Sequence, residues 1–167
     1  MTTLYLDMDG VVADFDEYAA RTLGIPPSSG IYPDEIWYNL ASNARLYRDL
    51  IKTTYADELV FQCSTIAKQQ GYNLKFLTAV PKGNDVPWAF YDKVVWAQTH
   101  FPGIPVMFGP FSKDKHIHCR AGDILIDDRA SNIEEWTAAG GNAILHTDFA
   151  STMTQLDHLI PQVSLQV

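Results

Sequence analysis

Four aspartates follow short apolar segments of the chain, where carboxylates are placed to do chemistry. Asp7 and Asp9 come directly after the first apolar segment, and Asp127 and Asp128 follow the fourth. Thr78 ends the second segment. In an open α/β sheet, ligands bind outside the carboxyl ends of the strands. If these segments are strands of one sheet, the four carboxylates and the hydroxyl share one crevice.

A divalent cation would relieve the repulsion within such a cluster. Carboxylates that lie close together raise one another's pKa values unless a positive charge compensates them. Mg²⁺ prefers carboxylate oxygens, water and phosphate as ligands, so we expect a Mg²⁺ site. An EF-hand calcium loop does not fit, because counting from Asp7 its required Gly and Glu positions hold Val12 and Tyr18. A plain solvated turn would explain one aspartate better than it explains four.

The spacing of Asp7 and Asp9 permits a division of labour. Side chains two residues apart on an extended strand start on the same side, and Gly10 lets the chain turn away. One carboxylate can attack phosphorus, while the other protonates a leaving oxygen and later deprotonates water. No GxxxxGK[ST] loop or GxGxxG turn occurs, so a nucleotide cradle of either type has no support.

The elements that would position these residues alternate along the chain. Apolar runs predict five strands, at residues 3–6, 74–77, 104–108, 124–126 and 143–145, and Pro105 indicates either an edge position or a strand start for the third. Apolar residues at helical spacing predict helices between them. These are Phe90, Val94, Ala97 and Phe101 after Pro87, a segment from a Ser131–Glu134 capping box to Gly140, and Met153, Leu156 and Leu159 before Pro161. The alternation is typical of an α/β fold with a Rossmann-like parallel sheet of about five strands flanked by helices.

One region interrupts the alternation just after the first strand. From about residue 13 to residue 54 the pattern is helical but broken by prolines, serines and Gly30. We expect a single domain over residues 1–167, with a core of residues 1–13 and 55–167. A small helical cap would occupy about residues 14–54.

Composition limits the partners and the compartment. The 167 residues carry 12 Lys and Arg against 20 Asp and Glu, a net charge of −8, and 47% of them are hydrophobic. So acidic a chain is a poor candidate for a stable nucleic-acid complex or for an anionic membrane surface. The two cysteines form no CxxC pair, and the N-terminus has no signal-peptide pattern, so we expect a cytoplasmic protein. A homodimer is compatible with the sequence but not required.

Four segments, in order, resemble the motifs of the haloacid dehalogenase-like hydrolases. They are LYLDMDGVVADFD at residues 4–16, FLTAVPK at 76–82, SKDKH at 112–116 and DILIDDR at 123–129. Within that superfamily the chain is most similar to the 5'(3')-deoxyribonucleotidases. It shares with them the DMDGV–ADF start, a short cap, a Thr followed by a Lys in the second motif, and the IDD ending.

The resemblance assigns roles to the motif residues. It implies that Asp7 is the nucleophile, that Asp9 is the general acid and base, and that Lys115 stabilises transition-state charge. The presence of Asp9 argues against dehalogenase chemistry. Mg²⁺ would be held by Asp7, the backbone carbonyl of Asp9, and Asp128 as the direct ligand supported by Asp127.

The same resemblance implies contacts with the substrate. Thr78 and Lys82 would bind the phosphate, and Phe15, Trp37 and Tyr38 would pack on the base or sugar. Ala79 is part of the substrate-binding segment, although these nucleotidases usually have a small hydroxyl residue there. Phe15 and Trp37 could instead be core anchors of the cap.

A lengthened loop after Lys115 places His116, His118 and Cys119 near the site. Without an evident fourth ligand, we interpret them as surface loop residues rather than as a transition-metal site.

The leading hypothesis is a Mg²⁺-dependent phosphatase that dephosphorylates deoxyribonucleoside monophosphates through an aspartyl-phosphate. A phosphatase for another small phosphomonoester, such as a sugar phosphate, or for a nucleic-acid end is the alternative. A non-catalytic nucleotide-binding module fits less well, because every catalytic position is filled.

Overall fold

Strands and helices alternate along the computed structural model, which describes residues 1–24, 32, 35, 38, 42, 45–82 and 86–160. Its elements are β1 (Thr3–Leu6), α1 (Phe15–Leu23), α3 (Ala56–Gln70), β2 (Asn73–Thr78), α4 (Ala89–His100), β3 (Val106–Phe108), the 3-10 helix η1 (Ser112–His118), β4 (Ile124–Asp127), α5 (Ala130–Ala138), β5 (Asn142–Leu145) and α6 (Phe149–Leu159). None of the helices in this part of the chain has the length and apolar character needed to cross a membrane.

The five strands form one parallel sheet in the order β3-β2-β1-β4-β5. This confirms the predicted α/β architecture and the edge position of β3. Strand β3 begins at Val106 rather than at Ile104, because Pro105 has no N–H and joins the sheet only through its carbonyl, which accepts from the N–H of Phe76 at 2.9 Å. Since β1 is central, the ends of β2 and β4 flank its end.

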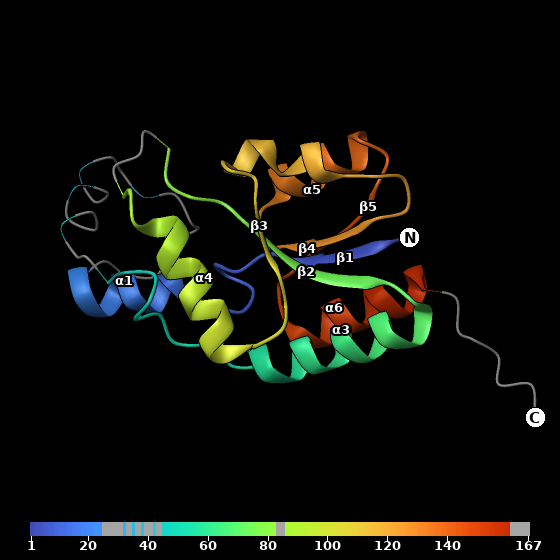
Figure 1. Ribbon diagram of the computed structural model, residues 1–167, viewed down its shortest axis with the longest axis horizontal. Coiled ribbons are helices and arrows are strands. Elements are labelled where there is room, and N and C mark those ends of the chain that lie inside the picture. The colour runs from blue at the N-terminus through green and yellow to red at the C-terminus, as the bar shows by residue number, and fades with distance from the viewer. Residues whose placement is uncertain are drawn as a thin grey trace, which may run out of the picture.

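Side chains of the strands alternate between two buried layers. Leu4 and Leu6 belong to the larger hydrophobic cluster, whereas Tyr5 packs with Trp136 of α5 in the smaller one. Helices α3 and α6 lie on one face of the sheet and α5 on the other (Figure 1). The period of two therefore anchors the sheet on both faces.

Helix α4 buries only part of the apolar stripe predicted for it. Phe90 and Val94 are partly exposed, whereas the buried residues of the helix are Ala89, Asp92, Lys93, Trp96 and Ala97. Two charged residues can face the interior because each has a partner there. Asp92 is bound by Arg48, and Lys93 binds Asp9. The prediction, made from apolar residues alone, was right for Ala97 and Phe101, which are buried, and wrong for Phe90 and Val94.

Helix α5 also begins differently from the prediction. Its N-cap residue is Arg129, which forms no side-chain cap, and Ser131 already lies inside the helix, so the capping box is absent. The carboxylate of Asp127 takes that place, because it accepts from the N–H of Arg129 at 2.9 Å and from the side chain of Asn132. The end of β4 and the start of α5 are therefore joined by one carboxylate.

The chain leaves the sheet after β1 and returns to it at neighbouring positions. The N–H of Asp14 donates to the carbonyl of Ile51 at 2.9 Å, and the N–H of Thr53 donates to the carbonyl of Val12 at 3.0 Å. Tyr18 of α1 and Tyr47 belong to the same hydrophobic cluster as the sheet. The predicted division into core and cap stays a prediction, although the paired ends are where an insertion would start and finish.

A buried carboxylate ties the start of β1 to the start of β4. Asp123 is 2% exposed, and its Oδ1 accepts from the N–H of Thr3 at 2.7 Å. Its Oδ2 accepts from the N–H of Arg120 at 3.0 Å. Hydrogen bonds to a charged acceptor are stronger than neutral ones, so this residue stabilises the centre of the sheet.

We expect Asp123→Ala to lower the free energy of unfolding by about 3 kcal/mol, because two backbone N–H groups lose a buried charged acceptor. Urea unfolding at neutral pH measures this change. Asp157→Ala, at an exposed position of α6, is the control and should cost less than about 0.5 kcal/mol. A decrease of less than about 1 kcal/mol in the free energy of unfolding of Asp123→Ala would contradict this stabilising role of Asp123.

Candidate active site

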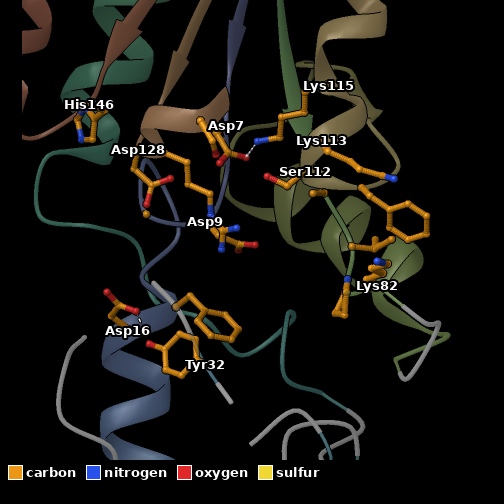
Figure 2. Close-up of a pocket in the computed structure, with 18 of the residues that line it drawn as sticks. Asp7, Asp9, Asp16, Tyr32, Lys82, Ser112, Lys113, Lys115, Asp128 and His146 are labelled. Carbon is orange, nitrogen blue, oxygen red and sulfur yellow. Dashed lines mark hydrogen bonds and ion pairs between the residues drawn. The ribbon is translucent and has the colours of Figure 1, made fainter. Parts of the chain in front are cut away.

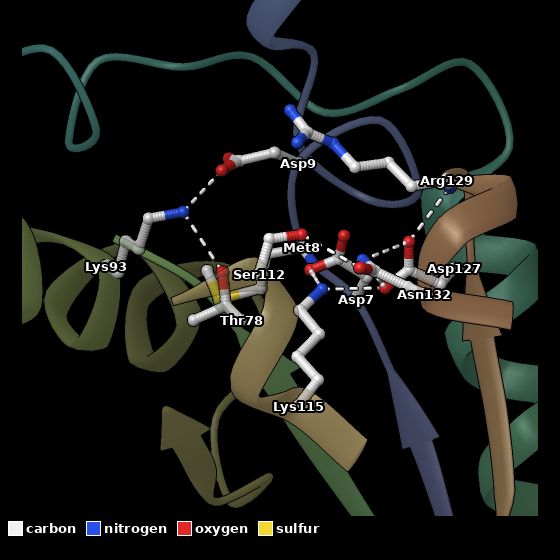
Figure 3. A network of polar contacts seen from close by, with 10 residues as sticks. All are labelled: Asp7, Met8, Asp9, Thr78, Lys93, Ser112, Lys115, Asp127, Arg129 and Asn132. Carbon is white, nitrogen blue, oxygen red and sulfur yellow. Dashed lines mark hydrogen bonds and ion pairs between the residues drawn. The ribbon is translucent and has the colours of Figure 1, made fainter. Parts of the chain in front are cut away.

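The ammonium group of Lys115 joins two strand ends. Its Nζ lies 2.7 Å from Oδ1 of Asp7, after β1, and 2.7 Å from Oδ2 of Asp127, at the end of β4. All three side chains are buried. Helix η1 carries Lys115 over the strand ends, as Figure 3 shows. The structure therefore brings together the predicted nucleophile and the predicted stabilising cation.

Both oxygens of Asp127 are fully engaged. Besides Lys115, they accept from the N–H of Arg129 and from Nδ2 of Asn132, which lies 3.0 Å from Oδ1 and 2.9 Å from Oδ2. Asn132 was not predicted as a site residue. Its position five residues after Asp127, on the first turn of α5, was the only signal in the sequence. Asp127 is thus held as a supporting group.

Asp128 has the opposite surroundings. Nothing in the described part of the chain donates a hydrogen bond to its carboxylate or forms an ion pair with it, and it lines the cavity. The carboxylate packs against Gly10, where a Cβ would lie 2.1 Å from Oδ2. Gly10 also has a φ of +77°, a conformation that side chains rarely adopt. Only glycine at this position leaves room for Asp128.

These carboxylates form a candidate cation site. Asp7, Asp127 and Asp128 each offer one oxygen, and the three atoms lie within 4.8 Å of one another. It is the only such group within the ranges that the structure describes. Because Asp127 is already satisfied by protein donors, the carboxylate of Asp128 and the oxygen of Asp7 that Lys115 and Met8 do not engage, Oδ2, are the groups available to a cation.

Asp9 points away from this cluster toward a lysine. Its Oδ2 lies 2.5 Å from Nζ of Lys93, which also donates to Oγ1 of Thr78 at 3.0 Å (Figure 3). Lys93 is 1% exposed, and Nζ lies 4.3 Å from the centre of the Tyr47 ring. The other oxygen of Asp9, Oδ1, is hidden from solvent and has no hydrogen-bond partner.

Lys93 was not predicted as a site residue. The signal was present in the helical pattern, because Lys93 lies between Ala89 and Trp96 on the stripe that α4 buries. A lysine in a buried stripe needs a partner, and its partner is 84 residues away in the sequence.

The carboxylates and lysines open on one cavity of about 1100 Å³ (Figure 2). Phe15, Tyr32 and Tyr47 form an aromatic wall, which adjoins Asp9 and Asp16. The rings of Phe15 and Tyr32 meet edge to face, with centroids 5.3 Å apart. A negatively charged group bound near Lys115 would therefore have aromatic side chains within the same cavity.

The predicted substrate residues are placed unequally. Phe15, Ala79 and Lys82 line the cavity, and Lys82 is exposed. Thr78 is fully buried, and its hydroxyl accepts from Lys93, so it lies behind the cavity wall. Tyr38 is 78% exposed and does not line the cavity.

Trp37 lies outside the described residues, so its predicted contact with the base stays a prediction.

Within the described residues, His116, His118 and Cys119 after Lys115 have separate neighbours. Nε2 of His118 hydrogen-bonds the carbonyl of Phe108 at 2.8 Å, and His116 lies on the outside of η1. Cys119 contacts the backbone near Trp136 instead. His116 is exposed, as expected of a surface loop residue, whereas His118 and Cys119 are half-buried.

Crowding and burial set the charges of the cluster. Burial raises the pKa of Asp7 to about 8 against the lowering effect of Lys115, and Asp127, Asp128 and Asp9 raise it further. Loss of water contact raises the pKa of Asp128 to about 6, and the charge of Asp127 adds to this. Burial lowers the pKa of Lys115, but Asp7 and Asp127 outweigh that effect, so the net pKa is raised. The cluster favours binding a cation.

The arrangement can carry out attack on phosphorus. In the ionised form that a bound cation favours, Asp7 is a carboxylate held by Lys115 and by the N–H of Met8, at 2.8 Å from Oδ1. Asp9 is a second carboxyl group on the same turn, half-buried at the cavity. A nucleophile, a proton donor and acceptor, and a buried cation are the parts that phosphoryl transfer requires.

Comparison with known proteins adds a family and a fold. The model of the family "5' nucleotidase, deoxy (pyrimidine), cytosolic type C protein" matches residues 31–155. That match includes Thr78, Lys115, Asp127 and Asp128 but begins after Asp7. No curated protein matches the chain.

Two solved structures show the same fold at low identity. A hydrolase from Streptococcus pneumoniae TIGR4 is 17% identical, with a TM-score of 0.50 over 93% of this chain and 97% of that one. An L-2-haloacid dehalogenase from Xanthobacter autotrophicus, with chloropropionic acid covalently bound, is 14% identical, with a TM-score of 0.52 over 86% of this chain and 76% of that one.

We expect the burial of Asp7 to make stability depend on pH in the metal-free protein. Folded Asp7, with its pKa of about 8, keeps a proton that the unfolded chain releases near pH 3.8, so its contribution to stability falls as pH rises between these values. Asp7→Asn removes this titration. The variant should therefore gain stability relative to the unchanged protein by about 1 kcal/mol per pH unit in that range.

Urea unfolding in EDTA at several pH values measures this difference. Asp157→Asn, at an exposed position, is the control and should show no trend. A difference between Asp7→Asn and the unchanged protein that stays constant with pH would contradict the assignment.

Proposed function

This chain belongs to the family of 5' nucleotidase, deoxy (pyrimidine), cytosolic type C proteins, within the haloacid dehalogenase-like hydrolases, and we propose that it is a Mg²⁺-dependent 5'(3')-deoxyribonucleotidase. The protein is a phosphatase of the nucleotidase type. The substrate would be a deoxyribonucleoside monophosphate, and the products would be the nucleoside and inorganic phosphate.

One observation carries the proposal. Lys115 holds Asp7 at one end of a cavity, Asp9 faces the same cavity, and an aromatic wall that includes Phe15 adjoins Asp9. A phosphate near Lys115 would therefore leave the organic part of the substrate beside aromatic rings. Base stacking on an aromatic face contributes about 1–3 kcal/mol per base.

In the first step, a carboxylate oxygen of Asp7 attacks phosphorus and the bond from phosphorus to the leaving oxygen breaks. Asp9 gives its proton to that oxygen, so the nucleoside leaves as an alcohol. Lys93 holds Oδ2 of Asp9 and so fixes this carboxyl group beside the cavity. Lys115 offsets the negative charge that gathers at Asp7 and the phosphoryl oxygens.

In the second step, the aspartyl-phosphate on Asp7 is hydrolysed. Asp9, now a carboxylate, takes a proton from a water molecule as the water oxygen attacks phosphorus. The bond between phosphorus and the Asp7 oxygen breaks, and inorganic phosphate is released. Asp7 returns as a carboxylate and Asp9 returns with its proton, so the cycle closes.

The residues present fit a Mg²⁺ ion. Asp128 has a carboxylate that no described protein group engages, and its oxygen lies within 4.8 Å of oxygens from Asp7 and Asp127. We expect Asp7, Asp128 and the backbone carbonyl of Asp9 to hold the ion, with Asp127 in support. When bound, Mg²⁺ would neutralise charge on the carboxylates and the phosphate.

The cap is part of the same proposal. Residues of about 14–54 would cover the cavity and select the organic group, with Phe15 at the base or sugar. Lys82 would approach the phosphate from the exposed rim. Thr78, buried behind the wall, would act through Lys93 and Asp9 unless the wall moves.

We expect phosphate release from deoxyribonucleoside monophosphates in the presence of Mg²⁺ and none in EDTA. Asp7→Asn should lower kcat by at least about 1,000-fold, because the nucleophile is lost. A colorimetric phosphate assay on a panel of deoxynucleotides, ribonucleotides and sugar phosphates measures both.

Asp157→Asn, far from the cavity lining, is the matched control and should keep full activity. Turnover of sugar phosphates alone would contradict the substrate but keep the reaction. If no substrate of the panel releases phosphate, the phosphatase assignment is contradicted and a binding module is favoured.

We also expect millimolar MgCl₂ to raise Tm more at about pH 8 than at about pH 5. The protons of Asp7 and Asp128, with pKa values of about 8 and about 6, compete with the ion at low pH. The rise should be about 3 °C at the higher pH and under about 1 °C at the lower. Asp128→Asn should abolish it, whereas an equal rise at both pH values would argue against binding at these carboxylates.

A further inference from the structure

A second polar group lies in the cavity, away from the reacting carboxylates. Figure 2 shows Asp16 and Tyr32 together, at the opposite end from Lys115, with Asp9 between. The hydroxyl of Tyr32 donates to Oδ1 of Asp16. Asp16 is half-buried on the first turn of α1, and the mechanism above does not use it.

Asp16 carries a charge without a neighbouring cation. No Lys, Arg or His among the described residues forms an ion pair with it. A carboxylate only accepts hydrogen bonds, and it repels a phosphate. Its partner in the cavity must therefore be a group that donates, on the part of the substrate that carries no charge.

The surroundings hold this acceptor in place. The ring of Tyr32 packs edge to face on Phe15, with an interplanar angle of 66°, and Phe15 lies 6.2 Å from the ring of Tyr47. The hydroxyl of Tyr32 fixes one oxygen of Asp16, so Oδ2 is the oxygen left for a ligand. A flat group lying against these rings would present its edge to that oxygen.

We propose that Asp16, held by Tyr32, determines specificity by accepting a hydrogen bond from a donor group of the nucleoside that is released. The donor is an N–H of the base or the sugar hydroxyl. The inference rests on the proposed function and deepens it, because it says which part of the site recognises the leaving group.

The test compares Asp16→Ala with Glu17→Ala. Glu17 is the next residue of α1, lies outside the cavity lining and pairs with Arg21, so its variant removes the same charge from the same helix. The substrates are thymidine 5'-monophosphate and p-nitrophenyl phosphate, whose leaving group has an aromatic ring but no donor.

We expect Asp16→Ala to lower the ratio of kcat/KM for the nucleotide to kcat/KM for p-nitrophenyl phosphate by about tenfold, since a charged acceptor is lost. Glu17→Ala should leave the ratio unchanged. Tyr32→Phe keeps the carboxylate but frees it, and should lower the ratio about threefold. If Asp16→Ala does not fold, Asp16→Asn, which keeps the shape without the charge, should still lower the ratio.

Two further substrates identify the donor. 2-Deoxyribose 5-phosphate has the sugar hydroxyl without a base, and 2',3'-dideoxythymidine 5'-monophosphate has the base without that hydroxyl. A loss in Asp16→Ala confined to the dideoxynucleotide places the donor on the base, and a loss confined to the sugar phosphate places it on the sugar; both support the proposal.

Other outcomes overturn it. An unchanged ratio, or an equal loss for every substrate including p-nitrophenyl phosphate, shows that Asp16 does not read the leaving group. If the unchanged protein turns over none of these substrates, the phosphatase assignment itself has failed and the inference falls with it, an outcome readily told apart from the other two.

Discussion

A buried lysine between two carboxylates holds the strand ends of this protein together. Without Lys115, the buried carboxylates of Asp7 and Asp127 would face each other across neighbouring parallel strands, with the exposed carboxylate of Asp128 close by. Removing one partner from such a group leaves a buried charge that is costly. The position of η1, the first turn of α5 and the turn after β1 all serve to deliver groups to this point. The chemistry and the architecture therefore depend on the same ion pairs.

The sheet could be predicted from the sequence because two signals agree at each strand end. An apolar run gives the strand, and the Asp or Thr directly after it marks the edge where parallel strands present their carboxyl ends. The carboxylates of Asp7, Asp127 and Asp128 were predicted to converge for that reason, and they do. The residue types at each strand end were enough to predict this cluster, because parallel strands present their carboxyl ends at the same edge of the sheet.

The buried face of α4 could not be predicted in the same way. Apolar periodicity selected Phe90 and Val94, whereas the helix buries Asp92 and Lys93. Whether a charge may be buried is decided by a partner elsewhere in the chain, and the partners of these two residues are 44 and 84 residues away. Likewise, Ser131 does not cap α5; Arg129, just before the helix, and the side chain of Asn132 donate instead to Asp127, a buried carboxylate and therefore a strong acceptor.

The paired backbones at residues 12–14 and 51–53 affect how the segment between them could change in evolution. Because the segment between them departs and returns through adjacent hydrogen-bonded positions, its ends would stay together whatever length or sequence filled the gap. The reactive groups lie on the other side of that junction, at the strand ends. The segment of about residues 14–54 could therefore be replaced, in evolution or by design, without moving the reactive groups. Such a replacement would give the same reaction a new range of substrates.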